Sequence, residues 1–442
     1  MEMEEKMTER HCHPRLMRHD QIFQVEDILT NVLSRLPVKI LMRFRCVCKR
    51  WRNLITDDPY FIQLHSLQYN SKQPLFLISS TLADSRERSP YSISLKSMDR
   101  ETNLISRFEV KCANIYAKLV PTRFDLVCIQ DDMIVHICNP STHEFITLPE
   151  HHLPLWYSTV GFGYVQSTDE YKVVSLLNPD YDRVEDGFRV DAASFKTKCH
   201  VFTLGMERRG SSSCASSSSS WAWREVMDSP YLVNYSTPPA FVNGAIHWLV
   251  LYNFEMDVEV FDWDMVDPNY SIIAFDVERE EFRLVSHPEG CPDVKSLQYH
   301  KNFETIELQL VELGGLLCLS CAKDSKMDIW MLNDYYYESG NDHISGTWVK
   351  EYRIDVSGTW VKGYSIYLMN DDHCNYYAPR DIEDTEVLIE SYMNGLEYYH
   401  LQSKRFKEFM RRSRQMPNLR FSFYLESLRS LKQFAQNWIS SE

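Results

Sequence analysis

The chain has 442 residues, of which 44% are apolar and 13% aromatic, and its formal net charge is −15 at pH 7. This length and apolar content suit a folded protein of two or three domains with a large core, and the acidic balance argues against nucleic acid as a partner. The twelve cysteines follow no spaced framework, which predicts reduced core residues in a protein of the cytosol or nucleus.

Residues 1–21 are predicted to form a disordered tail. They alternate charges and lack an apolar h-region, so we expect neither a signal peptide nor a membrane anchor, and no later apolar run reaches the length of a membrane span. His11, Cys12, His13 and His19 lie in this polar tail, where an ordered metal site is not expected. The sequence therefore predicts no metal, no other cofactor and no membrane contact.

A compact unit of three helices is predicted over residues 22–67. Pro37 suits the first turn of the second helix, where a missing backbone donor costs nothing, and Asp57, Asp58 and Pro59 end the third helix. The apolar faces are Ile28, Leu29, Val32, Leu33 and Leu36, then Ile40, Leu41 and Phe44, then Val47, Trp51, Leu54 and Ile55. A unit of about forty residues buries too little surface to be stable alone, so it is predicted to dock onto a partner.

The segment LPVKILMRFRCVCKRWRNLI, residues 36–55, resembles the F-box, the helical motif that binds the Skp adaptor of cullin-RING ubiquitin ligases. The resemblance implies the Skp adaptor as a direct partner and the cullin and RING subunits as indirect ones. One pair departs from the usual pattern, because Gln24 and Val25 stand where F-boxes have Leu-Pro. The implied adaptor-binding residues are Ile28, Leu29, Leu33, Leu36, Pro37, Val38, Leu41, Phe44, Val47, Cys48, Trp51, Leu54 and Ile55.

The charge distribution agrees with docking. Between Leu36 and Thr56 there are six basic residues and no acidic one, so the rest of the chain carries −21. A basic rim speeds the encounter with an acidic partner. The alternative is an ordinary solvated helix face.

From residue 74 to residue 425 the pattern changes to short runs of β-branched and aromatic residues between turn-forming clusters, which predicts a large mainly-β domain. Leu75 to Ile78 pairs with Tyr91 to Leu95, and Leu126 to Ile129 pairs with Ile134 to Cys138. Residues 426–442 are predicted to be a separate C-terminal segment. The chain is thus of the α+β multidomain class, with an all-α unit followed by a β domain.

A unit of strand, polar connection and second strand recurs five times in this domain. The units start 57 to 71 residues apart, at Ile134, Val201, Ile272, Ile329 and Tyr398. Repeats of this kind indicate radial or solenoid stacking. The glycine-turn hairpins FVNGAIHWL and ELGGLLCLS precede two of the units and would complete four-stranded sheets. We therefore predict a β-propeller of the kelch-like kind, whose closed ring protects strand edges, with a β-sandwich as the alternative.

A second resemblance lies in VGFGYVQSTDEYKVVSL, residues 160–176, which is similar to the GFGY and DxYKVV signature of the plant F-box-associated region. NPST at residues 139–142 and FVNGAIHWL fit the same family. The resemblance implies a substrate receptor, and some similar members belong to the S-locus group that recognises ribonucleases. The strand DLVCIQDDM lacks the glycine usual in that group.

The sequence offers no catalytic constellation. It has no phosphate loop, no G-x-S-x-G elbow and no H-E-x-x-H helix. Its one C-x-x-C, Cys318 to Cys321, falls on a predicted strand without a second pair, which favours core cysteines over zinc ligands. We therefore expect a non-catalytic receptor subunit; the alternative is a ligand- or carbohydrate-binding β module with no role in a ligase.

The predicted target-binding residues lie in NFEMDVEVFDWDMVDPN, residues 253–269, where acidic residues alternate with aromatic ones. Aromatic anchors beside acids suit a basic protein partner. The alternative is an edge strand with a solvated acidic face. The residues chosen are Phe254, Phe261, Asp262, Trp263 and Asp264.

Two further segments have structural explanations. GSSSCASSSSS, residues 210–220, is predicted to be a flexible insert, because glycine and serine bury too little surface to order a loop. The twin stretches GTWVKEYRI and GTWVKGYSI start at Gly346 and Gly358 and predict a lengthened loop or edge hairpin.

Overall fold

The computed structural model describes residues 27–69, 74–83, 91–113, 117–131, 134–150, 158–177, 197–205, 221–229, 231–235, 237–250, 270–292, 307–323, 326–337, 343–356, 377–383, 385–391, 395–411, 420–432 and 434. Several predictions from the sequence lie outside these residues. They concern the tail, Gln24 and Val25, the serine-rich insert, the second GTWVK copy and the target-binding segment 253–269.

The N-terminal unit contains four helices, so the prediction of three was wrong. They are residues 27–33, α2 (Val38–Phe44), α3 (Lys49–Asp57) and α4 (Pro59–Tyr69). The turn at Asp58 and Pro59 ends α3 as predicted but also begins α4, because the Asp58 carboxylate accepts a hydrogen bond of 3.1 Å from the Phe61 backbone N–H. Pro37 is the residue before α2 rather than part of its first turn.

Among the residues that the structure describes, the β domain forms six four-stranded sheets in chain order, the fourth and fifth of which join edge to edge into one sheet of eight strands. The first is β24 (Arg420–Tyr424), β1 (Leu75–Ala83), β2 (Tyr91–Met98) and β3 (Leu104–Cys112). The second is β4 (Lys118–Val120), β5 (Val127–Asp131), β6 (Ile134–Asn139) and β7 (Glu144–Thr147). The third is β8 (Ser158–Val165), β9 (Glu170–Leu177), β10 (Lys198–Leu204) and β11 (Arg224–Glu225).

The remaining three sheets follow the same order from inner to outer strand. The fourth is β12 (Ala240–Val242), β13 (Ala245–Leu249), β14 (Tyr270–Asp276) and β15 (Glu281–Ser286). The fifth is β16 (Glu307–Leu313), β17 (Leu316–Lys323), β18 (Lys326–Tyr337) and β19 (His343–Asp355). The sixth is β20 (Tyr377–Glu383), β21 (Glu386–Ser391), β22 (Gly395–His400) and β23 (Arg405–Arg411). A short parallel pairing of β15 with β19 joins the fourth and fifth sheets.

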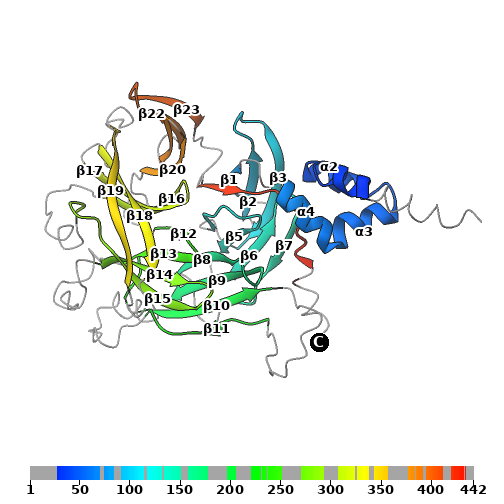
Figure 1. Cartoon of the computed structure of the whole chain (residues 1–442), viewed down its shortest axis with the longest axis horizontal. Coiled ribbons are helices and arrows are strands. Elements are labelled where there is room, and N and C mark those ends of the chain that lie inside the picture. Colours follow the sequence, from blue (N-terminus) through cyan, green and yellow to red (C-terminus); the bar gives the residue numbers. More distant parts are fainter. Residues whose placement is uncertain are drawn as a thin grey trace, which may run out of the picture.

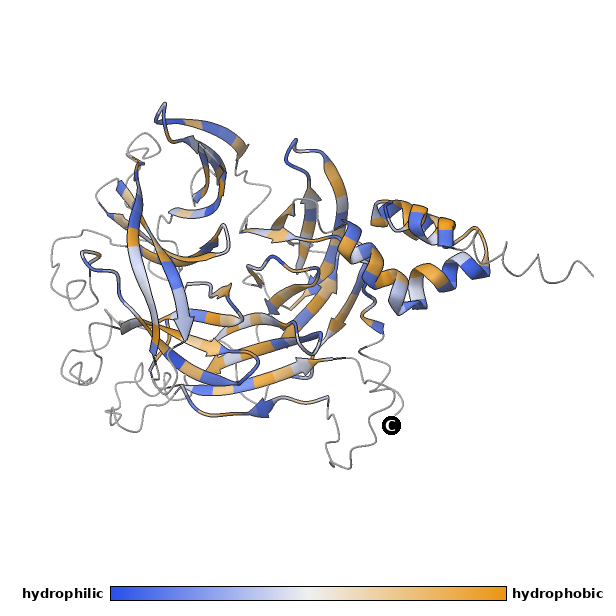
Figure 2. Ribbon diagram, viewed as in Figure 1, coloured by the Kyte–Doolittle hydropathy of each residue, from blue (hydrophilic) through white to orange (hydrophobic). Residues whose placement is uncertain are grey.

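The six sheets form a β-propeller, so the predicted propeller is confirmed and the sandwich alternative is wrong. A buried apolar cluster lies between each sheet and the next, and the cluster containing Phe76, Leu388 and Phe421 joins the sixth sheet back to the first. The ring and the helices beside β3 and β7 are seen in Figure 1, and Figure 2 shows hydrophobic residues running along the strands and helices. All five predicted two-strand units are antiparallel pairs, as expected.

The last strand closes the ring. β24 pairs antiparallel with β1, for example Leu77 opposite Ser422, and so becomes the inner strand of the first sheet. This strand was not predicted from the sequence.

Neighbouring sheets approach each other closely at the GFGY signature. A Cβ atom on Gly161 would lie 2.6 Å from Ile246 and 2.7 Å from Trp248, both on β13 of the next sheet. Only glycine leaves room for this packing.

His247, in the FVNGAIHWL hairpin, is fully buried between polar partners. Its Nδ1 lies 3.2 Å from the Ala240 carbonyl oxygen and its Nε2 lies 3.0 Å from the Tyr335 hydroxyl. Because a carbonyl only accepts, Nδ1 carries the proton and Nε2 accepts from Tyr335. Burial lowers the pKa of His247 from 6.5 to about 4, because the charged ring would lose its hydration.

We predict that His247 makes stability depend on pH. The unfolded chain binds a proton at His247 below pH 6.5 and the folded chain only below about pH 4, so the stability present above pH 6.5 is lost as the pH falls through this window. Between pH 7 and pH 5 this loss is about 2 kcal/mol. Urea unfolding at pH 7 and at pH 5 measures the free energy of unfolding at each pH. This free energy should fall less between the two pH values in His247→Asn than in the wild type. Equal losses in both proteins would contradict the assignment.

Candidate functional site

The helical unit presents an exposed apolar surface. Ile28, Val32 and Val47 have exposed fractions of 64%, 54% and 60%. Ile28 and Val32 lie one turn apart on the first helix and therefore share a side of it. Large apolar side chains exposed on so small a unit are typical of an interaction surface.

The predicted adaptor-binding residues divide into three groups. Ile28, Val47 and Cys48 are exposed. The half-buried ones are Leu29, Leu36, Pro37, Phe44, Trp51 and Leu54. The buried ones are Leu33, Val38, Leu41 and Ile55, which form the core of the unit together with Phe61. The buried side chains hold the helices together and present no surface to a partner.

The helical unit also exposes basic side chains. Lys39, Arg43, Lys49, Arg50 and Arg52 are exposed, whereas Arg45 is half-buried. The helical unit also contacts the propeller, because the Lys39 Nζ donates a hydrogen bond of 3.0 Å to the Ile105 carbonyl on β3. Five of the six basic residues are therefore exposed, and one of these five, Lys39, is bonded within the chain.

A pocket lies at the centre of the propeller, between its inner strands. Its volume is about 90 Å³, and it is lined by residues 121–124, 239–241, 310–312, 379–380 and 421–423. The lining is mainly proline, phenylalanine and aliphatic side chains, and Phe124 and Phe241 meet edge to face with centroids 5.1 Å apart. An enclosed apolar cavity of about 150 Å³ admits benzene; this pocket is smaller, and its lining also includes Arg123, Glu312 and Arg380.

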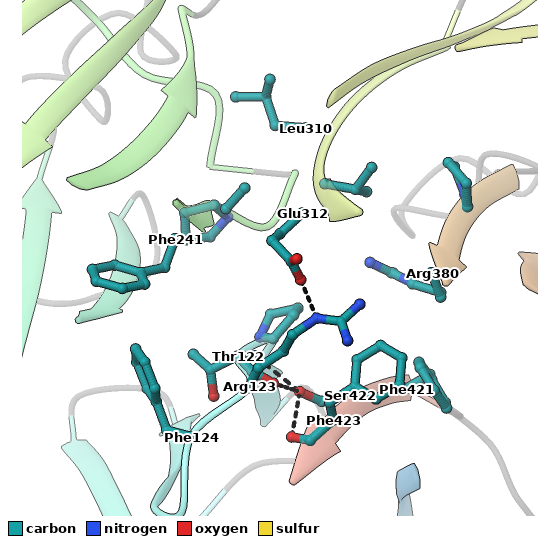
Figure 3. Close-up of a pocket in the computed structure, with 15 residues that line it drawn as sticks. Thr122, Arg123, Phe124, Phe241, Leu310, Glu312, Arg380, Phe421, Ser422 and Phe423 are labelled. Atoms are coloured by element: carbon teal, nitrogen blue, oxygen red, sulfur yellow. Dashed lines mark hydrogen bonds and ion pairs between the residues drawn. The ribbon is translucent and has the colours of Figure 1, made fainter. Parts of the chain in front are cut away.

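The Arg123 side chain lies at the centre of this pocket (Figure 3). Its guanidinium forms ion pairs with Glu312 of the fifth sheet and, at 3.2 Å, with Asp381 of the sixth. It also lies over the Phe423 ring of the first sheet, 3.8 Å from the centroid. One side chain from the segment after β4 therefore links three other sheets.

The acids at the pocket are paired with cations. Asp381 also accepts from Arg100 at 3.1 Å, and Arg380 pairs with Glu390 at 2.7 Å in a buried position. The pocket therefore lacks the convergent free acids that would favour a carbohydrate site. Sequence reasoning missed this cluster, because Arg123 is 189 and 258 residues from its two partners.

The cysteines and other ligand-type residues form no metal centre in the described part of the chain. Cys318 and Cys321 both lie on β17 but belong to different buried clusters, on opposite faces of the sheet. Among the described residues, no three His, Cys, Asp or Glu side chains are grouped to hold a metal. None of the helices described is long and apolar enough to cross a membrane.

Comparison with known families accounts for both parts of the chain. Residues 25–63 match the model of the F-box domain, and residues 75–342 match that of the F-box associated beta propeller domain. The chain belongs to the plant F-box proteins with an F-box-associated propeller. The matched propeller region ends before the sixth sheet and the closing strand β24.

Similar proteins from Arabidopsis thaliana are named as F-box proteins. An F-box protein is 24% identical over 345 residues, covering 74% of this chain and 72% of its own length. An F-box/kelch-repeat protein is 23% identical over 332 residues, covering 70% of this chain and 75% of its own. Membership of the S-locus group stays a prediction.

We predict that Arg123 stabilises the ring. Arg123→Met keeps an unbranched apolar stem but removes the guanidinium that pairs with Glu312 and Asp381, which should lower the free energy of unfolding by about 2 to 3 kcal/mol. Arg107→Met is the matched control, because the Arg107–Glu109 pair is about half exposed on both sides, and it should change stability by less than about 0.5 kcal/mol. If urea unfolding showed the same loss of stability for both variants, the pocket ion pairs would stabilise the fold no more than an exposed pair does.

Proposed function

We propose that this protein is the substrate-recognition subunit of an SCF-type cullin-RING ubiquitin ligase. In this proposal the F-box binds the Skp adaptor, the propeller binds a target protein, and the chain itself performs no catalysis. The observation that carries it is the surface of the F-box, where Ile28, Val32 and Val47 are exposed on a unit that also exposes five basic side chains. The complex would act in the cytosol or nucleus.

Two physical effects support docking of the F-box on an acidic adaptor. Covering the exposed apolar side chains removes them from water, which is favourable by about 25 cal/mol per Å². The basic rim attracts an acidic partner and mainly raises the association rate. Assembly should therefore slow with increasing salt more than it weakens at equilibrium.

The propeller supplies the target side of the proposal. The central pocket offers an apolar seat of about 90 Å³, and the acidic segment 253–269 remains the predicted site for a basic target. Holding a target beside a charged conjugating enzyme accelerates ubiquitin transfer by raising the local concentration of the target's lysines. No side chain of the receptor then needs to take part in bond making.

We predict that Val47→Asp disrupts adaptor binding. The side chain is exposed, so the fold should be unaffected while a charge is placed in the interface, and co-purification with a Skp adaptor and cullin should fall at least tenfold. Met227→Asp is the matched control, because Met227 has the same exposed fraction of 60% but lies on the propeller. Undiminished co-purification of Val47→Asp would place the adaptor elsewhere.

We predict that Phe241→Ala weakens target capture and leaves adaptor binding intact. Phe241 is half-buried at the pocket, where its ring packs on Phe124. Proteins that co-purify with the wild-type receptor after proteasome inhibition are measured by quantitative mass spectrometry. The amounts of captured target should be lower with Phe241→Ala. Phe145→Ala, on the outer strand β7, is the control. An unchanged protein set would exclude the pocket as the target site.

A further inference from the structure

The residues after the closing strand form a strap between the propeller and the F-box. We define the C-terminal strap as residues 425–432 and 434, which continue from β24. It begins beside the pocket, where the Leu425 N–H donates a hydrogen bond of 3.0 Å to the Phe124 carbonyl. In Figure 1 the red C-terminal segment lies between β7 and the helices.

One end of the NPST motif binds the strap. The Asn139 amide donates to the carbonyl oxygens of Ser427 and Arg429, at 3.2 and 2.9 Å, and its own carbonyl oxygen accepts from the Tyr424 hydroxyl at 2.6 Å. The Glu144 carboxylate accepts from the Ser430 hydroxyl and the Leu431 N–H. The second sheet thus holds the strap by its backbone.

Arg429 joins the strap to both the second and the third sheet. Its guanidinium pairs with Asp125 at 3.3 Å and with Asp169 at 2.9 Å, and it lies over the Tyr171 ring, 5.4 Å from the centroid. These charged and ring partners keep the pKa of Arg429 well above its ordinary value despite burial. Asp169 and Tyr171 belong to the DxYKVV signature.

The opposite side of the strap enters the F-box. Leu428 is 4% exposed and belongs to the same buried cluster as Leu33, Val38, Leu41, Ile55 and Phe61. Leu431 and Phe434 instead join the cluster between the second and third sheets. Successive side chains of the strap therefore pack into two different domains.

We propose that the C-terminal strap fixes the orientation of the F-box relative to the propeller, with Leu428 and Arg429 as positioning residues. Burial of the Leu428 side chain among F-box residues removes apolar surface from water and so stabilises the contact between the two domains. Leu428 and Arg429 are adjacent in the chain and are anchored in different domains, so the strap ties the F-box to the propeller at this point. Under the proposed ligase function, on which this inference rests, the strap sets where a captured target lies relative to the transferred ubiquitin.

The test compares Leu428→Ala, which cuts the F-box side, with Arg429→Gln, which cuts the propeller side. Lys432→Ala is the matched control, because Lys432 lies in the strap but its side chain is 75% exposed. Small-angle X-ray scattering of the full chain bound to a Skp adaptor reports the arrangement of the domains. We expect both positioning variants to lose the single orientation that fits the wild type and the control, although they act on opposite sides.

A second measurement uses self-ubiquitination in the reconstituted ligase, which needs no identified target. We expect ubiquitin to spread over more propeller lysines in both positioning variants than in Lys432→Ala, as mapped by mass spectrometry. Unchanged scattering in Arg429→Gln would overturn the strap, even where Leu428→Ala fails to fold. If the adaptor does not bind, the same scattering comparison is made on the free chain. Failure of the ligase proposal is thereby distinguished from failure of the proposal for the strap.

Discussion

The pairing of β24 with β1 is the interaction on which the rest of the structure depends. It gives the first sheet its inner strand and joins the two ends of the β domain, so that the ring has no open inner edge. It also brings Phe421 and Phe423 to the wall of the pocket and delivers the strap to the F-box. Closure, pocket and domain orientation therefore follow from one strand of five residues.

The F-box is a small domain whose apolar side chains are only partly buried by its own helices. Its helices are too few to bury all their apolar faces, and the structure divides the remainder between two uses. Leu428 from the far end of the chain completes the core, whereas Ile28, Val32 and Val47 remain outside it. The helical unit thus docks on its own propeller with one face and keeps another available for a partner.

The sequence predicted features that depend on local chemistry. The two-strand units, the glycine hairpins and the end of α3 were found because period-two alternation and turn residues act over a few positions. β24 escaped because its pairing with β1 joins the ends of the chain, and the Arg123 ion pairs escaped because charged partners hundreds of residues apart leave no spacing to read. The start of α4 could have been found, since Asp-Pro is a helix-initiating pair.

The signature motifs acquire a role that hairpin geometry alone does not explain. Asp169 sits in the left-handed region with φ of 59° and turns the β8–β9 hairpin, which glycine would do with less strain. A glycine there would leave Arg429 with one carboxylate partner instead of two and Tyr164 without its acceptor. Asp169 and Asn139 are therefore better understood as the receptor for the strap. In this chain the NPST and DxYKVV motifs each supply one residue, Asn139 and Asp169, to the site that holds the strap.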